Sequence, residues 1–128
     1  MYKHEKDNES AEMYLETILL LKKEKSIVKS IDVSEKMNFS RASVSRAVSL
    51  LRDKNLITID NVDGNIVFTK EGEEYANRVF HRHCILNDFF ISLGISKETA
   101  EEDACKVEHI LSNESFEAIE NYVKNLEK

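Results

Sequence analysis

The chain has 128 residues, a formal net charge of −6 and 41% hydrophobic residues, which suits one domain or two small domains that share a core. Its two cysteines, Cys84 and Cys105, argue against a disulfide framework and favour free thiols or metal ligands in a reducing compartment. Neither an apolar run of 18 residues nor a signal-peptide pattern is present, so we expect a cytoplasmic protein that does not enter a membrane.

Three helices and a hairpin are predicted in the first half of the chain. The expected elements are helices over residues 10–23, 31–37 and 40–54 and strands over residues 56–61 and 66–69. Ser10 and Ser40 are candidate N-caps, and Asn38-Phe39 forms the turn between the second and third helices. This order of elements is typical of a winged helix-turn-helix, whose third helix enters the major groove of DNA.

The second half is predicted to be wholly helical. The expected helices cover about residues 70–93, 97–111 and 114–127. Gly94 ends the first of them and Ser96 caps the next. The predicted fold class is therefore mainly α. A winged helix-turn-helix DNA-binding domain with a two-stranded hairpin covers residues 1–72, and a helical metal-binding and dimerisation domain covers residues 73–128.

The charge is unevenly distributed between these halves. Residues 29–60 carry six basic and four acidic groups, whereas residues 93–128 carry four lysines and nine acidic groups. This asymmetry suits an N-terminal half that binds DNA and a C-terminal half that binds cations.

On the helix expected over residues 40–54, apolar and polar side chains occupy opposite faces. The predicted buried stripe is Val44, Ala47, Val48 and Leu51. The candidate groove-facing residues are Ala42, Ser45, Arg46 and Ser49, with Ser40, Arg41, Ser43 and Arg52 beside the DNA phosphates. Arg46 can pair bidentately with guanine, whereas the acidic wing tip at Asp63 is assigned no base contact. The alternative is a structural three-helix unit whose polar face is only solvated.

A set of metal-ligand types lies on the helix expected over residues 97–111. Cys105, Glu108 and His109 fall at i, i+3 and i+4, and Glu101 lies on the same face. Apolar residues such as Ala100 point to the other face. The spacing predicts a metal site, and the alternative is an ordinary solvated face opposite the core.

Four stretches of the chain resemble the diphtheria toxin repressor and manganese transport regulator family of metal-activated transcriptional repressors. The stretches are "AEMYLETILLL", "FSRASVSRAVSLLRDKNLI", "FTKEGEEYANRVFHRHCIL" and "EEDACKVEHILS". In that family the first helix, the fourth helix and a Cys-or-Glu, Glu, His triplet supply the ligands. The resemblance therefore implies metal ligation by Met13, His83, Cys105, Glu108 and His109.

The residues at these positions also indicate which metal is preferred. Family members that select manganese typically have carboxylates where this chain has Met13 and Cys105, and two sulfurs suit borderline ions. The ligand set therefore favours Fe(II) as cofactor and Mn(II) next, while Zn(II), Co(II) or Ni(II) would bind in vitro. A second site is less complete, because Asn87 and Glu101 replace a carboxylate and a histidine of the iron-responsive branch. Glu101 and Glu16 could supply its oxygen ligands.

We therefore expect a homodimeric repressor of metal-uptake genes that binds a palindromic double-stranded operator when metal is bound. The apolar positions available for a subunit interface are Phe89, Phe90, Ile91, Phe116, Ile119, Tyr122 and Val123. One alternative is a metal-independent winged-helix regulator that responds to a small organic ligand bound in a roomy apolar pocket. The other is an enzyme with Cys105 as nucleophile and His109 as base, but no glycine motif for an oxyanion hole accompanies them. We expect no enzymatic activity.

Overall fold

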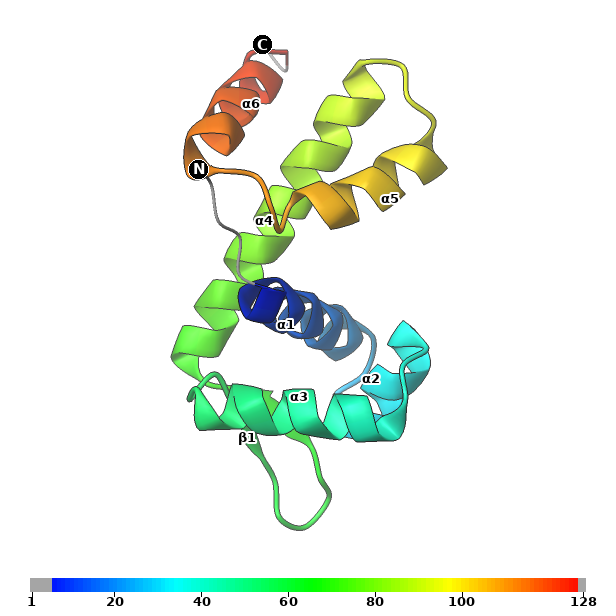
Figure 1. The fold of residues 1–128 in the computed structure, drawn as a ribbon, viewed down its shortest axis with the longest axis vertical. Helices are drawn as coiled ribbons and strands as arrows, with labels where there is room; N and C mark the ends of the chain where they lie inside the picture. The colour runs from blue at the N-terminus through cyan, green and yellow to red at the C-terminus, as the bar shows by residue number, and fades with distance from the viewer. Residues whose placement is uncertain (1–5, 127–128) are drawn as a thin grey trace. The chain divides into compact units, whose positions relative to one another are not determined.

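The structure is a computed structural model that describes residues 6–126, and it is mainly α-helical with one two-stranded hairpin, as predicted (Figure 1). Its elements are α1 (Lys6–Glu24), α2 (Ser30–Met37), α3 (Arg41–Asp53), β1 (Ile57–Ile59), β2 (Ile66–Phe68), α4 (Lys70–Ser92), α5 (Lys97–Val107) and α6 (Asn113–Leu126). They form two compact units, one ending at Asn77 and the other beginning at Arg78, within α4. Within residues 6–126, none of the helices has the length and apolar character needed to cross a membrane.

The N-terminal unit is a winged helix-turn-helix, as the order of predicted elements indicated. In Figure 1, α1 lies across α3, and the hairpin projects from the other side of α3. The core between these elements contains the fully buried residues Leu15, Ile18, Val33, Val44, Val48, Leu51, Ile57 and Ile66. Asn38 adopts a left-handed conformation with φ of 57° at the end of α2, which turns the chain into α3 as expected. Strands β1 and β2 pair antiparallel, with Thr58 opposite Val67.

The C-terminal unit contains α5, α6 and most of α4. Ala100 and Ala104 are completely buried, and their small side chains allow α5 to pack closely. The ring of Phe89 on α4 meets that of Tyr122 on α6 edge to face at 5.8 Å. Among the predicted interface residues, Phe116 and Val123 are buried within the chain, whereas Ile91 and Tyr122 are more than two-fifths exposed and remain available for a partner.

Two predicted helix ends are wrong. Helix α1 begins at Lys6 and not at Ser10, because serine inside a helix costs little and its capping preference does not fix the start. Helix α5 ends at Val107, whereas the sequence predicted residue 111. The chain tightens there, since the N–H groups of Ile110 and Leu111 both donate to the carbonyl of Val107.

Candidate metal centre and DNA-facing helix

The end of α5 meets the middle of α4 in a cluster of polar side chains. His83 Nδ1 lies 2.8 Å from Glu108 Oε2 and 3.8 Å from Cys105 Sγ. His109 Nε2 lies 3.1 Å from the other carboxylate oxygen of Glu108. The remaining nitrogen of His83, Nε2, lies 3.0 Å from Glu101. The structure therefore brings five of the seven predicted ligands together within the C-terminal unit.

The centre of this cluster is buried, which is not what a solvated helix face predicts. Glu108 is 1% exposed, and His83 and His109 are each 6% exposed. Cys105 and Glu101 lie at its exposed edge. A buried carboxylate is costly unless charged or hydrogen-bonding groups compensate it, and here an imidazole faces each of its oxygens. The two polar residues that follow α5, Glu108 and His109, are thus part of the interior.

The surroundings of His83 raise its pKa to about 11. Cys105 is the largest cause and Glu108 the next, because both favour the protonated ring, while burial acts in the opposite direction. Without metal, His83 is therefore an imidazolium at neutral pH.

The donor set fits a divalent transition metal. Within residues 78–126 the cluster offers two imidazoles, one thiol and two carboxylates, which together suit Fe(II), Co(II), Ni(II) and Zn(II), and with more oxygen donors also Mn(II). His109 and Glu108 follow the last turn of α5, where the tightened backbone turns both side chains inward.

The two other predicted ligands lie in the N-terminal unit. Met13 and Glu16 occupy neighbouring turns of α1, with Met13 37% exposed and Glu16 7% exposed. Their participation stays a prediction. His81 pairs with Glu120 of α6 at the surface, and Cys84 is half-buried on α4.

Sequence reasoning missed Phe80, whose ring stacks on His83 at 6.3 Å with an interplanar angle of 10°. The signal was available, since Phe80 precedes His83 by three residues and such neighbours share a helix face. The two rings therefore lie nearly parallel on one side of α4.

The predicted DNA-facing residues lie along the outside of α3. Ser40 is the N-cap, as predicted, and its hydroxyl accepts from the N–H of Ser43 at 3.1 Å. The predicted inward stripe is also observed, with Ala47 half-buried beside its three buried members. The outward residues Arg41, Ala42, Ser45, Arg46 and Arg52 are exposed, whereas Ser43 and Ser49 are half-buried. Arg46 Nη2 lies 3.5 Å from Ser43 Oγ.

An open groove follows this face and is lined by Ser45, Arg46, Ser49, Leu50 and Asp53. Leu50 and Asp53 were not predicted. Leu50 is apolar and yet 59% exposed. Its position four residues after Arg46, on the same helix face, could have identified it.

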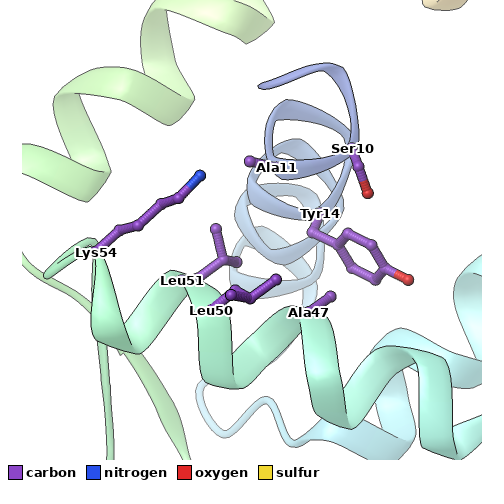
Figure 2. Close-up of a pocket in the computed structure, with 7 residues that line it drawn as sticks. All are labelled: Ser10, Ala11, Tyr14, Ala47, Leu50, Leu51 and Lys54. Atoms are coloured by element: carbon purple, nitrogen blue, oxygen red, sulfur yellow. The ribbon is translucent and has the colours of Figure 1, made fainter. Parts of the chain in front are cut away.

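A smaller pocket lies between α1 and α3 (Figure 2). Its lining consists of Ser10, Ala11, Tyr14, Ala47, Leu50, Leu51 and Lys54, and its volume is about 170 Å³. Figure 2 shows Lys54 extending along one side while the hydroxyl of Tyr14 points away on the other. Pockets for drug-sized ligands have about 300–1,000 Å³, so this pocket is too small to enclose one.

The fold and the cluster together define a winged-helix DNA-binding protein with a separate helical unit suited to metal. Two family profiles match nearly all of the chain. "Iron dependent repressor, N-terminal DNA binding domain" matches residues 8–64, and "Iron dependent repressor, metal binding and dimerisation domain" matches residues 69–128.

Named relatives agree with these profiles. The HTH-type transcriptional regulator MntR of Bacillus subtilis is 30% identical over 119 residues, which span 93% of this chain and 83% of that regulator. MntR of Geobacillus kaustophilus is 29% identical over 115 residues, which span 90% of this chain and 81% of the relative. The chain therefore belongs to the diphtheria toxin repressor and manganese transport regulator family of metal-dependent transcriptional repressors, as its motifs predicted.

Solved structures share the fold. A manganese-dependent transcriptional repressor in complex with manganese superimposes with a TM-score of 0.81 at 22% identity, covering 89% of this chain and 52% of that one. The IdeR protein of T. acidophilum gives a TM-score of 0.75 at 24% identity, covering 91% of this chain and 54% of that one. The chain spans about half the length of these two proteins.

The raised pKa of His83 has a measurable consequence for the metal-free protein. The stabilisation it brings is fully present below the ordinary pKa of 6.5 and is lost as the pH rises toward about 11. In chelator, we expect His83→Gln to destabilise the fold more at about pH 6 than at about pH 10 in urea unfolding. Nitrogen NMR of the parent should show His83 still protonated above neutral pH. His81→Gln is the control, and a His83 signal that titrates near 6.5 would contradict the assignment.

Proposed function

We propose that this protein represses metal-uptake genes and that Fe(II), or next Mn(II), is its corepressor. The buried cluster of His83, Glu108 and His109 with Cys105 at its edge carries the proposal. Without metal, the charges within this cluster compensate one another. When its histidines and cysteine are deprotonated, the cluster offers a mixed set of nitrogen, oxygen and sulfur donors. In this role the protein acts in the cytoplasm, on chromosomal DNA.

The proposed ligands come from both units. Cys105, Glu108 and His109 form the main set together with Met13, whereas His83, Glu101 and Glu16 are the candidates for a second ion. Divalent metal binding is the common property of the family, and the preference for Fe(II) rests on the two sulfurs. Coordination by residues of both units restricts their relative arrangement and so selects a form that is competent to bind DNA.

The proposed DNA reader is the outer face of α3. Arg46 and Ser45 read base edges with Ala42 and Ser49, while Arg41 and Arg52 contact phosphates with Ser40 and Ser43. The dimerisation profile over residues 69–128 supports a homodimer, and a two-fold dimer reads a palindromic operator. The exposed side chains of Ile91 and Tyr122 are candidate members of its interface.

The alternatives receive less support. A regulator controlled by a small organic ligand requires a roomy apolar pocket, and the one between α1 and α3 is too small for a drug-sized compound. Catalysis by Cys105 with His109 is also disfavoured. The imidazole facing Cys105 is that of His83, and His109 is held by Glu108. We therefore propose a regulator without enzymatic activity.

The metal switch is tested by His109→Ala and by the milder His109→Gln. Because the glutamine amide can still donate to Glu108, we expect His109→Gln to keep the parent's helix content and dimeric state, and we expect both variants to lose metal-stimulated operator binding. Fluorescence anisotropy on a selected operator, anaerobically with Fe(II), Mn(II) or chelator, measures this loss. His81→Ala is the matched control on the surface of α4. Unchanged metal stimulation in both His109 variants would favour the small-ligand alternative.

The DNA reader is tested by comparing two arginines of α3. Arg46→Ala should weaken operator binding by about 1–3 kcal/mol and leave random DNA less affected, since it removes a base contact. Arg41→Ala should weaken both DNAs alike and lower the salt dependence, because it removes a phosphate contact. Titrations at several salt concentrations distinguish the two. Equal losses on operator and random DNA for Arg46→Ala would assign Arg46 to the phosphates.

Metal preference is tested by replacing both sulfur donors with carboxylates. In the double variant Met13→Asp with Cys105→Glu, harder oxygen donors should shift activation of operator binding toward Mn(II) relative to Fe(II). Competition with a fluorescent chelator measures the ranking of the metals. Cys84→Ser is the control for loss of a thiol that is not among the proposed ligands. If the ranking does not change, these two side chains do not coordinate.

A further inference from the structure

Four hydrogen bonds converge on Asn65, at the end of the wing turn. Its side-chain Oδ1 accepts from Lys22 Nζ at 2.8 Å and from the N–H of Val28 at 2.9 Å. Its own N–H donates to Asp63 Oδ1 at 2.8 Å, and its carbonyl accepts from the N–H of Asp60 at 2.9 Å. The amide thus joins the wing to two points of the chain about 40 residues earlier.

The next residue continues the attachment. The N–H of Ile66 donates to the carbonyl of Val28 at 2.7 Å, and both side chains are completely buried. Lys22 lies in the last turn of α1 and is half-buried, and this burial lowers its pKa while Asp63 opposes the shift. We call the group Lys22, Val28, Asn65 and Ile66 the wing latch.

The wing latch holds the connection between α1 and α2. The other side of that connection is fastened to α2, because Asp32 accepts from Lys25 Nζ at 2.7 Å and from the N–H of Lys29 at 2.8 Å. Residues 25–29 are therefore fastened on one side to the wing and on the other to the first helix of the helix-turn-helix. α1 is also the helix that carries the proposed ligands Met13 and Glu16.

We propose that Asn65 is a positioning residue that couples metal binding at α1 to the orientation of the helix-turn-helix. This inference rests on the proposed function, in which α1 supplies metal ligands. Without the Oδ1 acceptor, the N–H of Val28 and the ammonium of Lys22 lose a shared partner, and the connection between α1 and α2 becomes free to relax. Metal binding to α1 then has a weaker effect on the orientation of α2 and α3.

The test compares Asn65→Ala with Asn65→Asp, which retains the acceptor oxygen, and with Asn61→Ala, which removes an exposed amide from the same wing. The measured quantity is the operator Kd in chelator divided by the operator Kd in saturating Mn(II). We expect Asn65→Ala to lower this ratio by about three- to tenfold, and the other two variants to stay within about twofold of the parent. Mn(II) affinity of the free protein should not change.

Two further measurements separate coupling from stability. Since coupling is reciprocal, Mn(II) affinity of the operator-bound protein should fall in Asn65→Ala by the same factor as the ratio. Hydrogen exchange of the Val28 N–H should accelerate in this variant alone. If Asn65→Ala does not fold, Lys22→Met removes one of the two side-chain bonds and should lower the ratio in the same direction.

The outcomes are distinguishable. A lower melting temperature with an unchanged ratio means that Asn65 only stabilises the fold, and it overturns the inference. Unchanged exchange of the Val28 N–H overturns it as well. A parent protein that binds the operator equally with and without Mn(II) overturns the proposed function together with this inference.

Discussion

The carboxylate of Glu108 is the constraint on which the C-terminal unit depends. It is nearly completely buried, and an imidazole faces each of its oxygens, His83 from α4 and His109 from the turn after α5. A buried charge is tolerated only with such compensation, so the requirement fixes where α5 ends and which face it turns toward α4. The same arrangement brings the thiol of Cys105 to the edge of the cluster.

Charge compensation also explains how the cluster can respond to its surroundings. In the metal-free protein the hydrogen bonds of His83 to Cys105 and to Glu108 raise its pKa to about 11, and the proton on His83 balances the carboxylate of Glu108. In the proposed function a divalent cation would supply positive charge in place of that proton, so proton and metal would compete for the same donors. The charge of the cluster would then be balanced both with and without metal, as the proposed switch requires.

The N-terminal unit is under a different constraint, because the polar outer face of α3 must stay uncovered. Packing of α3 on α1 uses its apolar stripe, and the outer face stays exposed around Arg46. Asn65 and Asp32 then fasten the connection between α1 and α2 through side-chain oxygens that accept backbone N–H groups. The contacts of Asn65 join segments about 40 residues apart, so no local pattern indicated them, whereas Asp32 follows Lys29 at the spacing of a capping box.

The sequence by itself determined the order of elements, the winged helix-turn-helix, the family and the residues of the triplet. These depend on local rules, such as capping by Ser40, the turn at Asn38 and the spacing of Cys105 and His109. Only the tertiary structure decided that α5 ends at Val107 and that Glu108 is buried. Burial and termination at this point depend on groups brought from another helix, and no local window of the sequence contains both partners.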